Sequence, residues 1–449
     1  MANRQISEHL ELTSVCLKSL PDGPDAWERA TSTQSCLERH ANYWWNTSGY
    51  ALAVLLHDAG YSYLTQARAL GFFCSNIAPN LGVALDKGTI HWPSFMTDDH
   101  TPVELSWDWH EGHQNPTIRF SMEVVGLAAG TADDPHNETA NENFAASIVN
   151  SLTEADALWF NYFYKRISKS HGVRESAGHK SKLFWAFDIG ATNITTKAYF
   201  LCAALAASSA GSNLQAITDM IRTAPQCTPE KLTAYDKFVA FHNSLSGSRL
   251  EIEMLAIDLL RPEYSRLKIY FRNRDTSFES VRQMMTLGGE AHTDGLEAGL
   301  QNLRTLWNSL FSRDAEQDST PLLFNSHRTA GILYNVEFYL GSSAPRVKIY
   351  IPVRHYATTD AQIMEAVNKV VDGQSLRRGN KKPSQSYVKA IHAIFTEDSL
   401  TDGLGVHTYI GCSIKDGGQL RVVSYINPSR AGASTANIVS GKPASSTGP

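Results

Sequence analysis

The feature that most constrains the fold is a strand-like segment carrying a cation, which recurs five times at intervals of 71 to 80 residues. Three copies place tyrosine two residues after the cation, and the last places Tyr425 four residues after it. Side chains on a strand alternate between its faces, so each of these cations points the same way as its tyrosine. The repeat predicts one shared interior, lined by positive charge and phenol rings. The five cations are Arg119, Lys197, Lys268, Lys348 and Arg421.

Each cationic segment is the second arm of a predicted hairpin. Turn residues separate it from a preceding run that is rich in Val, Ile, Tyr and Phe, as a hairpin requires. The predicted arms are Val103–His110 with Thr117–Val124, Leu183–Ile189 with Ile194–Phe200, Glu251–Leu260 with Arg266–Arg272, Tyr334–Gly341 with Arg346–Val353, and Val406–Ile414 with Gln419–Ile426.

The stretches between the hairpins have the apolar periodicity of helices. Ser151-Leu-Thr-Glu154 reads as a capping box that opens a helix over Ala155–Ser168. The same periodicity predicts helices over Thr276–Leu287, Gly295–Leu310, Trp27–Trp45 and Ser62–Ile77.

An α-α-β-β unit used five times gives ten antiparallel strands. An open sheet of this size would expose two edges, and closure removes them. We therefore predict an α+β fold in which a ten-stranded antiparallel barrel is surrounded by helices and encloses a solvent-filled chamber. Residues 1–430 are expected to form this single domain, and residues 431–449 a disordered tail.

Composition excludes several classes of function. The net charge of −5 argues against a nucleic-acid surface and a polybasic membrane patch. Six cysteines without a C-x-x-C pair indicate neither a disulfide framework nor a zinc site, and no apolar N-terminal segment predicts secretion, so a cytoplasmic location is expected. The Asp-rich stretch Asp133–Glu138 lies in a Pro/Asn-rich loop without a second copy, so no metal site is predicted there.

The repeated cations predict the ligand. Buried charges are costly without compensation, and a diphosphate would supply it. Arg266 and Arg346 share these strand faces and add to the positive charge. Tyrosine hydroxyls can donate to phosphate oxygens, and tyrosine rings can stabilise a nearby carbocation by roughly 0.5–2 kcal/mol each.

Glu104 is the other informative charge. Alternation along its strand places Glu104, Ser106 and Asp108 toward the chamber, with Val103, Leu105 and Trp107 on the opposite face. A carboxylate there can accept a hydrogen bond from an N–H or O–H of an aromatic substrate. The alternative is a salt bridge between Glu104 and a neighbouring lysine or arginine.

These motifs resemble those of the fungal aromatic (indole) prenyltransferases of the dimethylallyltryptophan synthase family. The resemblance covers about Leu10 to Arg430, and it implies an α-β-β-α barrel and a prenyltransferase activity that needs no metal. The matching segments are Ser94–Trp107 (SFMTDDHTPVELSW), Thr196–Phe200 (TKAYF), Arg266–Tyr270 (RLKIY), Leu287–Gly289 (LGG), Arg346–Val353 (RVKIYIPV) and His407–Tyr409 (HTY).

The resemblance also implies roles for individual residues. The donor diphosphate would be bound by Arg119, Lys197, Arg266, Lys268, Lys348 and Arg421, with Lys348 standing where many members have glutamine. The allylic cation would be shielded by Tyr199, Tyr270, Tyr350, Tyr409 and Tyr425. Glu104 would bind the indole N–H of the acceptor beside Phe95 and Met96, and Lys182 is a candidate for the final base.

The acceptor is less constrained. Family members that accept free tryptophan are expected to carry an arginine about a dozen residues before the Arg266–Tyr270 segment, where this chain has Glu251, Glu253 and Met254. We therefore expect a cyclic dipeptide or another larger indole, with a phenolic acceptor as the first alternative. A non-catalytic barrel that stores an isoprenoid diphosphate is the second. The protein is expected to be a monomer or a homodimer that binds neither nucleic acid nor membrane.

Overall fold

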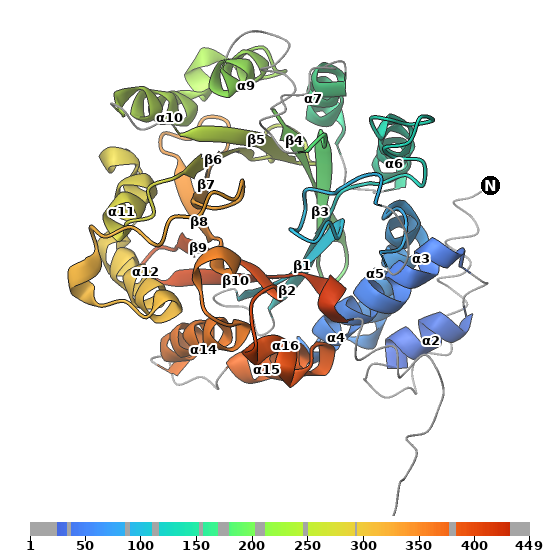
Figure 1. The fold of residues 1–449 in the computed structure, drawn as a ribbon. Helices are drawn as coiled ribbons and strands as arrows, with labels where there is room; N and C mark the ends of the chain where they lie inside the picture. The colour runs from blue at the N-terminus through green and yellow to red at the C-terminus, as the bar shows by residue number, and fades with distance from the viewer. Residues whose placement is uncertain are drawn as a thin grey trace, which may run out of the picture.

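Ten antiparallel strands close into a barrel within the part of the chain that the structure describes (Figure 1). This computed structural model describes residues 25–33, 37–85, 90–109, 116–151, 156–168, 179–202, 212–245, 250–291, 294–376 and 383–431. Strands that follow one another in the sequence are neighbours in the barrel, and β1 pairs with β10 to close it. The strands are β1 Val103–Trp109, β2 Thr117–Met122, β3 Leu183–Ile189, β4 Ile194–Leu201, β5 Glu251–Asp258, β6 Leu267–Asn273, β7 Ile332–Phe338, β8 Arg346–Ile351, β9 His407–Ile414 and β10 Leu420–Ile426.

Helices form a layer around the barrel (Figure 1). At least two of the described α-helices precede each hairpin in the sequence. None of the described helices combines the length and the apolar composition that a bilayer span requires. The helices are α2 Asp25–Thr33, α3 Arg39–Trp44, α4 Tyr50–Asp58, α5 Tyr63–Phe72, α6 Glu138–Ser151, α7 Leu158–Ser168, α9 Asn213–Arg222, α10 Thr233–Ser244, α11 Phe278–Thr286, α12 Leu296–Phe311, α13 Val353–Tyr356, α14 Asp360–Leu376, α15 Ser384–Ile394 and α16 Glu397–Thr401.

The main hydrophobic core lies between the outer face of the barrel and the helices. Trp107 on β1, for example, meets Tyr387 on α15 with a ring centroid separation of 5.5 Å. Ser106 and Asp108, on either side of Trp107, point to the barrel interior and are also buried. Strand β1 is therefore buried on both faces, and its inner face is polar because it lines a chamber.

The predicted architecture is confirmed, and the predicted strand bounds agree with the observed ones to within a few residues. The predicted capping box is wrong as a helix start, because Ser151 ends α6 and Leu152–Ala155 lie outside the described residues. Helix α7 begins at Leu158, whose backbone N–H donates to Asp156 Oδ1 at 2.8 Å. The predicted disordered tail also lies outside the described residues from position 432 onward.

Candidate active site

The barrel encloses a cavity of about 440 Å³, and its wall is divided into three zones along the barrel axis. Charged residues line one end, tyrosines form a belt in the middle, and Glu104 lies with apolar and arginine side chains at the other end. The zones follow from alternation along each strand. On β6, for example, the inward residues in order are Lys268, Tyr270 and Arg272.

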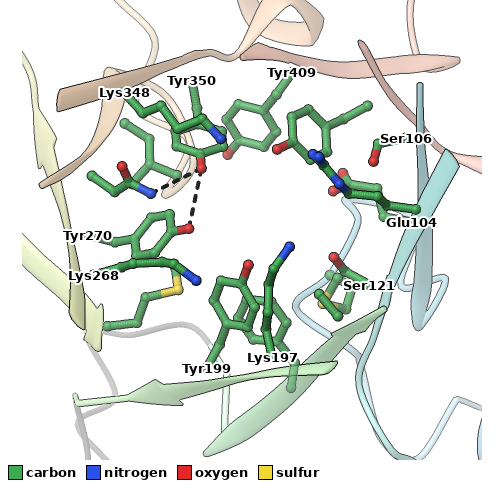
Figure 2. Close-up of a pocket in the computed structure, with 18 of the residues that line it drawn as sticks. Glu104, Ser106, Ser121, Lys197, Tyr199, Lys268, Tyr270, Lys348, Tyr350 and Tyr409 are labelled. Carbon is green, nitrogen blue, oxygen red and sulfur yellow. Dashed lines mark hydrogen bonds between the residues drawn. The ribbon is translucent and has the colours of Figure 1, made fainter. Parts of the chain in front are cut away.

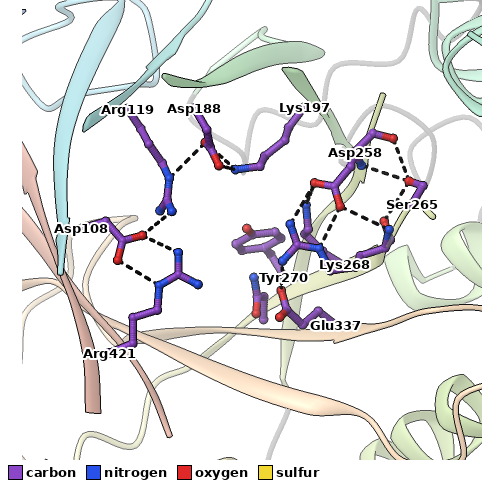
Figure 3. A network of polar contacts seen from close by, with 12 residues as sticks. Asp108, Arg119, Asp188, Lys197, Asp258, Ser265, Lys268, Tyr270, Glu337 and Arg421 are labelled. Carbon is purple, nitrogen blue, oxygen red and sulfur yellow. Dashed lines mark hydrogen bonds and ion pairs between the residues drawn. The ribbon is translucent and has the colours of Figure 1, made fainter. Parts of the chain in front are cut away.

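At the charged end, cations alternate with carboxylates around the wall (Figure 3). Asp108 on β1 pairs with Arg119 on β2 and accepts from Arg421 Nη2 on β10 at 2.5 Å. Asp188 on β3 pairs with Arg119 at 3.1 Å and with Lys197 on β4 at 2.5 Å. The three hairpins whose strands carry these residues, β1–β2, β3–β4 and β9–β10, are thereby joined through their side chains as well as their backbones.

The same pattern continues on the next strands. Asp258 at the end of β5 accepts from Lys268 Nζ at 2.6 Å and from Arg266 Nε at 2.8 Å. Arg266 also reaches Glu337 on β7 at 3.2 Å. These pairs are buried or half-buried, so each carboxylate compensates a cation that would be costly to bury by itself.

The sequence interpretation therefore needs a correction, because the cations are not held without internal counter-charges. Six cations, Arg119, Lys197, Arg266, Lys268, Lys348 and Arg421, share this end with four carboxylates, Asp108, Asp188, Asp258 and Glu337. The excess of positive charge is smaller than predicted, although it remains.

Three of these carboxylates were missed in the sequence, although a signal was present. Strand pairing sets Arg119 opposite Asp188, Lys197 opposite Asp258, and Lys268 opposite Glu337. Residues opposite one another on paired strands share a face of the sheet. The first strand of four hairpins thus carries an inward carboxylate, just as the second strand carries an inward cation. These carboxylates are Asp108, Asp188, Asp258 and Glu337.

The fifth hairpin breaks this pattern. Ser413 stands opposite both Lys348 and Arg421, where the other hairpins have a carboxylate. Within the described residues, Lys348 has no carboxylate at ion-pair distance, and its Nζ lies 5.8 Å from the ring centroid of Tyr350. Burial, reinforced by repulsion from Arg421, lowers the pKa of Lys348 to about 7. Lys348 is therefore the cation of this end that is most available to an anionic ligand.

The same contacts shift the pKa values of the paired groups. Burial alone would raise the pKa of Asp188, but the nearby Arg119 and Lys197 lower it to about 2. Burial lowers the pKa of Lys268 to about 8, and the positive charge of Arg266 acts in the same direction. Against the effect of burial, nearby cations likewise lower the pKa values of Asp258 and Glu337, so these two carboxylates and Asp188 are ionised at neutral pH.

Tyrosines from four strands form the belt above the charges. Tyr270 lies between Tyr199 and Tyr350, with ring centroids 5.8 and 5.6 Å away, and Tyr350 lies 5.8 Å from Tyr425. The hydroxyls of Tyr270 and Tyr350 are 3.3 Å apart (Figure 2). Burial raises the pKa of each of these tyrosines, so they stay neutral. The belt presents ring faces and hydroxyl donors to the cavity.

Glu104 lies at the other end of the cavity and is buried. Thr408 donates its hydroxyl to Glu104 Oε1 at 2.5 Å. Burial raises the pKa of Glu104 to about 7, against the hydrogen bond from Thr408 and the positive charge of Arg354. Glu104 has no cation at ion-pair distance among the described residues, so the alternative of a simple salt bridge is not what the structure places there.

Most of the predicted site residues are brought together. Phe95 and Met96 line the cavity at the Glu104 end, and Tyr409 lines it near Arg354, which donates to its hydroxyl at 3.3 Å. Lys182 is the exception. Its Nζ pairs with Glu138 of α6 at 2.9 Å, and it is not part of the cavity wall.

The structure thus argues against Lys182 as the base. Lys182 stands just before β3 begins, and its side chain reaches Glu138 in the helix layer. The first residue of β3 that lines the cavity is Phe184.

One group of described side chains offers ligand atoms for a metal ion. Asp98, His327 and His355 place these atoms within 4.8 Å of one another. Arg354 Nε lies 2.9 Å from the Asp98 carboxylate and therefore competes with any cation for it. The arrangement is better described as an arginine–carboxylate pair flanked by histidines.

Comparison with known proteins gives a coherent result. A sequence model described as tryptophan dimethylallyltransferase matches residues 40–390. The chain is 34% identical over 400 residues to 4-O-dimethylallyl-L-tyrosine synthase of Claviceps purpurea, covering 87% of this chain and 88% of that protein. It is 30% identical over 405 residues to 7-dimethylallyltryptophan synthase of Aspergillus fumigatus, covering 86% and 84%.

The fold is shared with a solved structure at lower identity. The crystal structure of AnaPT from Neosartorya fischeri superposes with a TM-score of 0.77 at 20% identity, covering 90% of this chain and 98% of that one. At this identity the likeness concerns the fold alone, and it shows that the closed barrel with its helix layer is an established architecture.

Proposed function

The chain belongs to the tryptophan dimethylallyltransferase family of aromatic prenyltransferases, and we propose that it transfers a dimethylallyl group from dimethylallyl diphosphate to a small aromatic acceptor held by Glu104. The observation that carries the proposal is the division of one cavity into a cationic end, a tyrosine belt and a carboxylate end. Each zone suits one part of such a reaction.

The cationic end suits the leaving group. The C–O bond of the donor breaks, and the diphosphate leaves with the bonding electron pair. Lys348, Lys268 and the arginines of this end would stabilise the charge that develops on the diphosphate, as preorganised cations do in other transition states. We propose that these side chains replace a divalent metal in this role.

The belt suits the allylic cation. Four tyrosine rings surround the middle of the cavity, and ring faces attract a cation while their bulk excludes water. Water that reached the cation would convert it to an alcohol. The belt would therefore keep the cation for the acceptor, whose ring or heteroatom supplies the electron pair for the new bond.

The carboxylate end suits the acceptor. Glu104 in its ionised form would accept a hydrogen bond from the acceptor, which orients the nucleophile and increases its electron density. The indole N–H that the sequence favours meets this requirement, and so does the O–H of a phenol. The phenolic class gains support from the 34% identity to an enzyme named for 4-O-dimethylallyl-L-tyrosine.

The test is a panel of acceptors incubated with dimethylallyl diphosphate in EDTA, with products identified by mass spectrometry. The panel contains tryptophan, tyrosine, cyclic dipeptides with tryptophan, and simple phenols. We expect at least one acceptor to gain a dimethylallyl group with release of one diphosphate. Donor binding without diphosphate release for any acceptor would instead favour a storage barrel.

Glu104→Gln tests the role of the carboxylate. The variant keeps the shape of the side chain but cannot accept as an anion, so turnover should fall by about 100-fold or more while the affinity for the donor is kept. The wild-type rate should rise with pH through about 7 as Glu104 loses its proton, and this rise should be absent in the variant. Unchanged turnover would remove Glu104 from the mechanism.

A further inference from the structure

Three arginines line the Glu104 end of the cavity, and they differ in their partners. Arg272 pairs with Glu253 at 2.6 Å, and Arg354 pairs with Asp98 at 2.9 Å. Arg328 has no carboxylate at ion-pair distance among the described residues. Its hydrogen bond to protein is from Nη2 to the backbone carbonyl oxygen of Phe95, at 2.9 Å.

The segment that carries Arg328 is held in place by two other arginines. Arg274 donates to the carbonyl oxygens of His327 at 3.1 Å, Arg328 at 3.1 Å and Ala330 at 2.7 Å. Arg272 donates to the carbonyl oxygen of Thr329 at 2.9 Å. Four consecutive carbonyl groups are thus fixed from β6 and the residue that follows it, so the backbone under Arg328 is preorganised.

Two glutamates complete this support. Glu251 pairs with Arg274 at 2.8 Å, and Glu253 pairs with Arg272 at 2.6 Å. These are the residues that replace the arginine expected of family members accepting free tryptophan. Because each glutamate forms an ion pair with an arginine, its negative charge is neutralised locally. The two glutamates would therefore not repel an anionic acceptor in the cavity.

Arg354, which lines the same end of the cavity, also has an N–H group without an acceptor among the described residues. Arg354 Nη1 is buried without a hydrogen-bond partner among the described residues, although the rest of its guanidinium contacts Asp98 and Tyr409. Burial lowers the pKa of Arg328, which reflects the cost of holding this guanidinium away from water. An anion placed here would offset that cost and fill the donor positions.

We propose that Arg328 binds a carboxylate of the acceptor, so that the preferred acceptor is an aromatic acid, such as a free aromatic amino acid, rather than a neutral cyclic dipeptide. The proposal rests on the proposed function and names the substrate class of the same site. The sequence predicts no arginine for an acceptor carboxylate, because β5 carries glutamates where such an arginine would stand. The arginine proposed here lies instead in the segment before β7.

The chemistry favours a carboxylate over a second phosphate. A guanidinium binds a planar carboxylate through two parallel N–H donors, and Arg328 retains donors beyond the one that contacts Phe95. The diphosphate has its own site across the tyrosine belt. With Glu104 accepting from the ring substituent and Arg328 binding the carboxylate, the acceptor would be held at both ends.

The test uses acceptor pairs that differ only by the carboxylate: tyrosine against tyramine, and tryptophan against tryptamine. In the wild-type enzyme we expect kcat/KM for the acid of the productive pair to exceed that for its amine. In Arg328→Gln the ratio of the two values should fall by about 10- to 100-fold, mainly through KM of the acid, as expected for loss of a charge-assisted hydrogen bond. Arg328→Lys should retain part of the ratio, and Arg282→Gln, on the outer surface, is the matched control.

Two outcomes would overturn the proposal. One is a wild-type preference for the amine, and the other is an unchanged ratio in Arg328→Gln. Binding is also measured calorimetrically with the thiolodiphosphate analogue of the donor, which does not react. If no acceptor is prenylated, the proposed function fails, but the calorimetric ratio of acid to amine still decides whether Arg328 binds a carboxylate.

Discussion

Replacing Ser413 with aspartate is expected to weaken binding of dimethylallyl diphosphate by about 10- to 100-fold. Ser413 is the inward residue of β9 that stands opposite Lys348 and Arg421, in the one hairpin without a carboxylate. Aspartate would complete the ring of carboxylates. It would pair with Lys348, the cation that has no ion pair within the described residues, and reduce the positive excess of this end.

The magnitude follows from the geometry. Side chains opposite one another on paired strands have Cβ atoms about 5 Å apart, so the new carboxylate would stand roughly 8 Å from a bound diphosphate. At an effective dielectric constant of about 20, one unit charge repels another at this distance by about 2 kcal/mol. Partial neutralisation by Lys348 reduces this repulsion, and the several charges of the diphosphate increase it. A loss of about 1.4 to 2.8 kcal/mol corresponds to the stated range.

The assay is calorimetric titration with the thiolodiphosphate analogue, with Ser413→Asn as the neutral control of the same size. The pH dependence gives a second readout. In the wild type, donor affinity should decline as pH rises through about 7, because Lys348 loses its proton. In Ser413→Asp the new carboxylate raises the pKa of Lys348, so the decline should move to higher pH. Equal donor affinities for the aspartate and asparagine variants would refute the reasoning.

Three further predictions concern the barrel interior. Asp258→Asn leaves Arg266 and Lys268 without their shared counter-charge and should lower the free energy of unfolding by about 3–5 kcal/mol in urea titrations; a loss under about 1 kcal/mol would show that the pairs contribute little. The lowered pKa of Asp188 contributes stability that is present above the unfolded value of about 3.9 and is lost as pH falls through about 2, so Asp188→Asn should flatten the acid limb of stability against pH; an unchanged limb would contradict this. Gly411→Ala places a Cβ 3.1 Å from the ring of Tyr425 and should open the belt, which would raise the ratio of dimethylallyl alcohol to prenylated product; an unchanged ratio would show that the ring moves without exposing the cation to water.

The fold was largely predictable because its signal is repeated. Alternation, turn residues and helical periodicity recur five times, so an error in one unit, such as the misplaced start of α7, does not alter the architecture. The belt was predictable for the same reason, since Tyr199, Tyr270 and Tyr350 each follow their cation by two residues. These inferences need only the direction of a side chain within its own strand.

The partners of the charges were not predictable in this way. Asp258 and Glu337 both meet Arg266. Asp258 does so within the β5–β6 hairpin, whereas Glu337 belongs to the next hairpin and reaches Arg266 through the pairing of β6 with β7. The position of Lys182 was also not predictable, because a residue at the end of a strand can turn to either side of the sheet. Its ion pair with Glu138 on α6 holds the side chain outside the cavity.

The sequence by itself determined the closed barrel, the inward faces of its strands and the positions of Glu104 and the cations, because these depend on a period of two along single strands. Only the tertiary structure decided which charges neutralise one another, that Lys348 is left opposite Ser413, and that Arg328 enters the Glu104 end of the cavity from a distant segment. The physical reason is that the energy of an ion depends on all the groups around it, and register between strands brings those groups from across the whole chain.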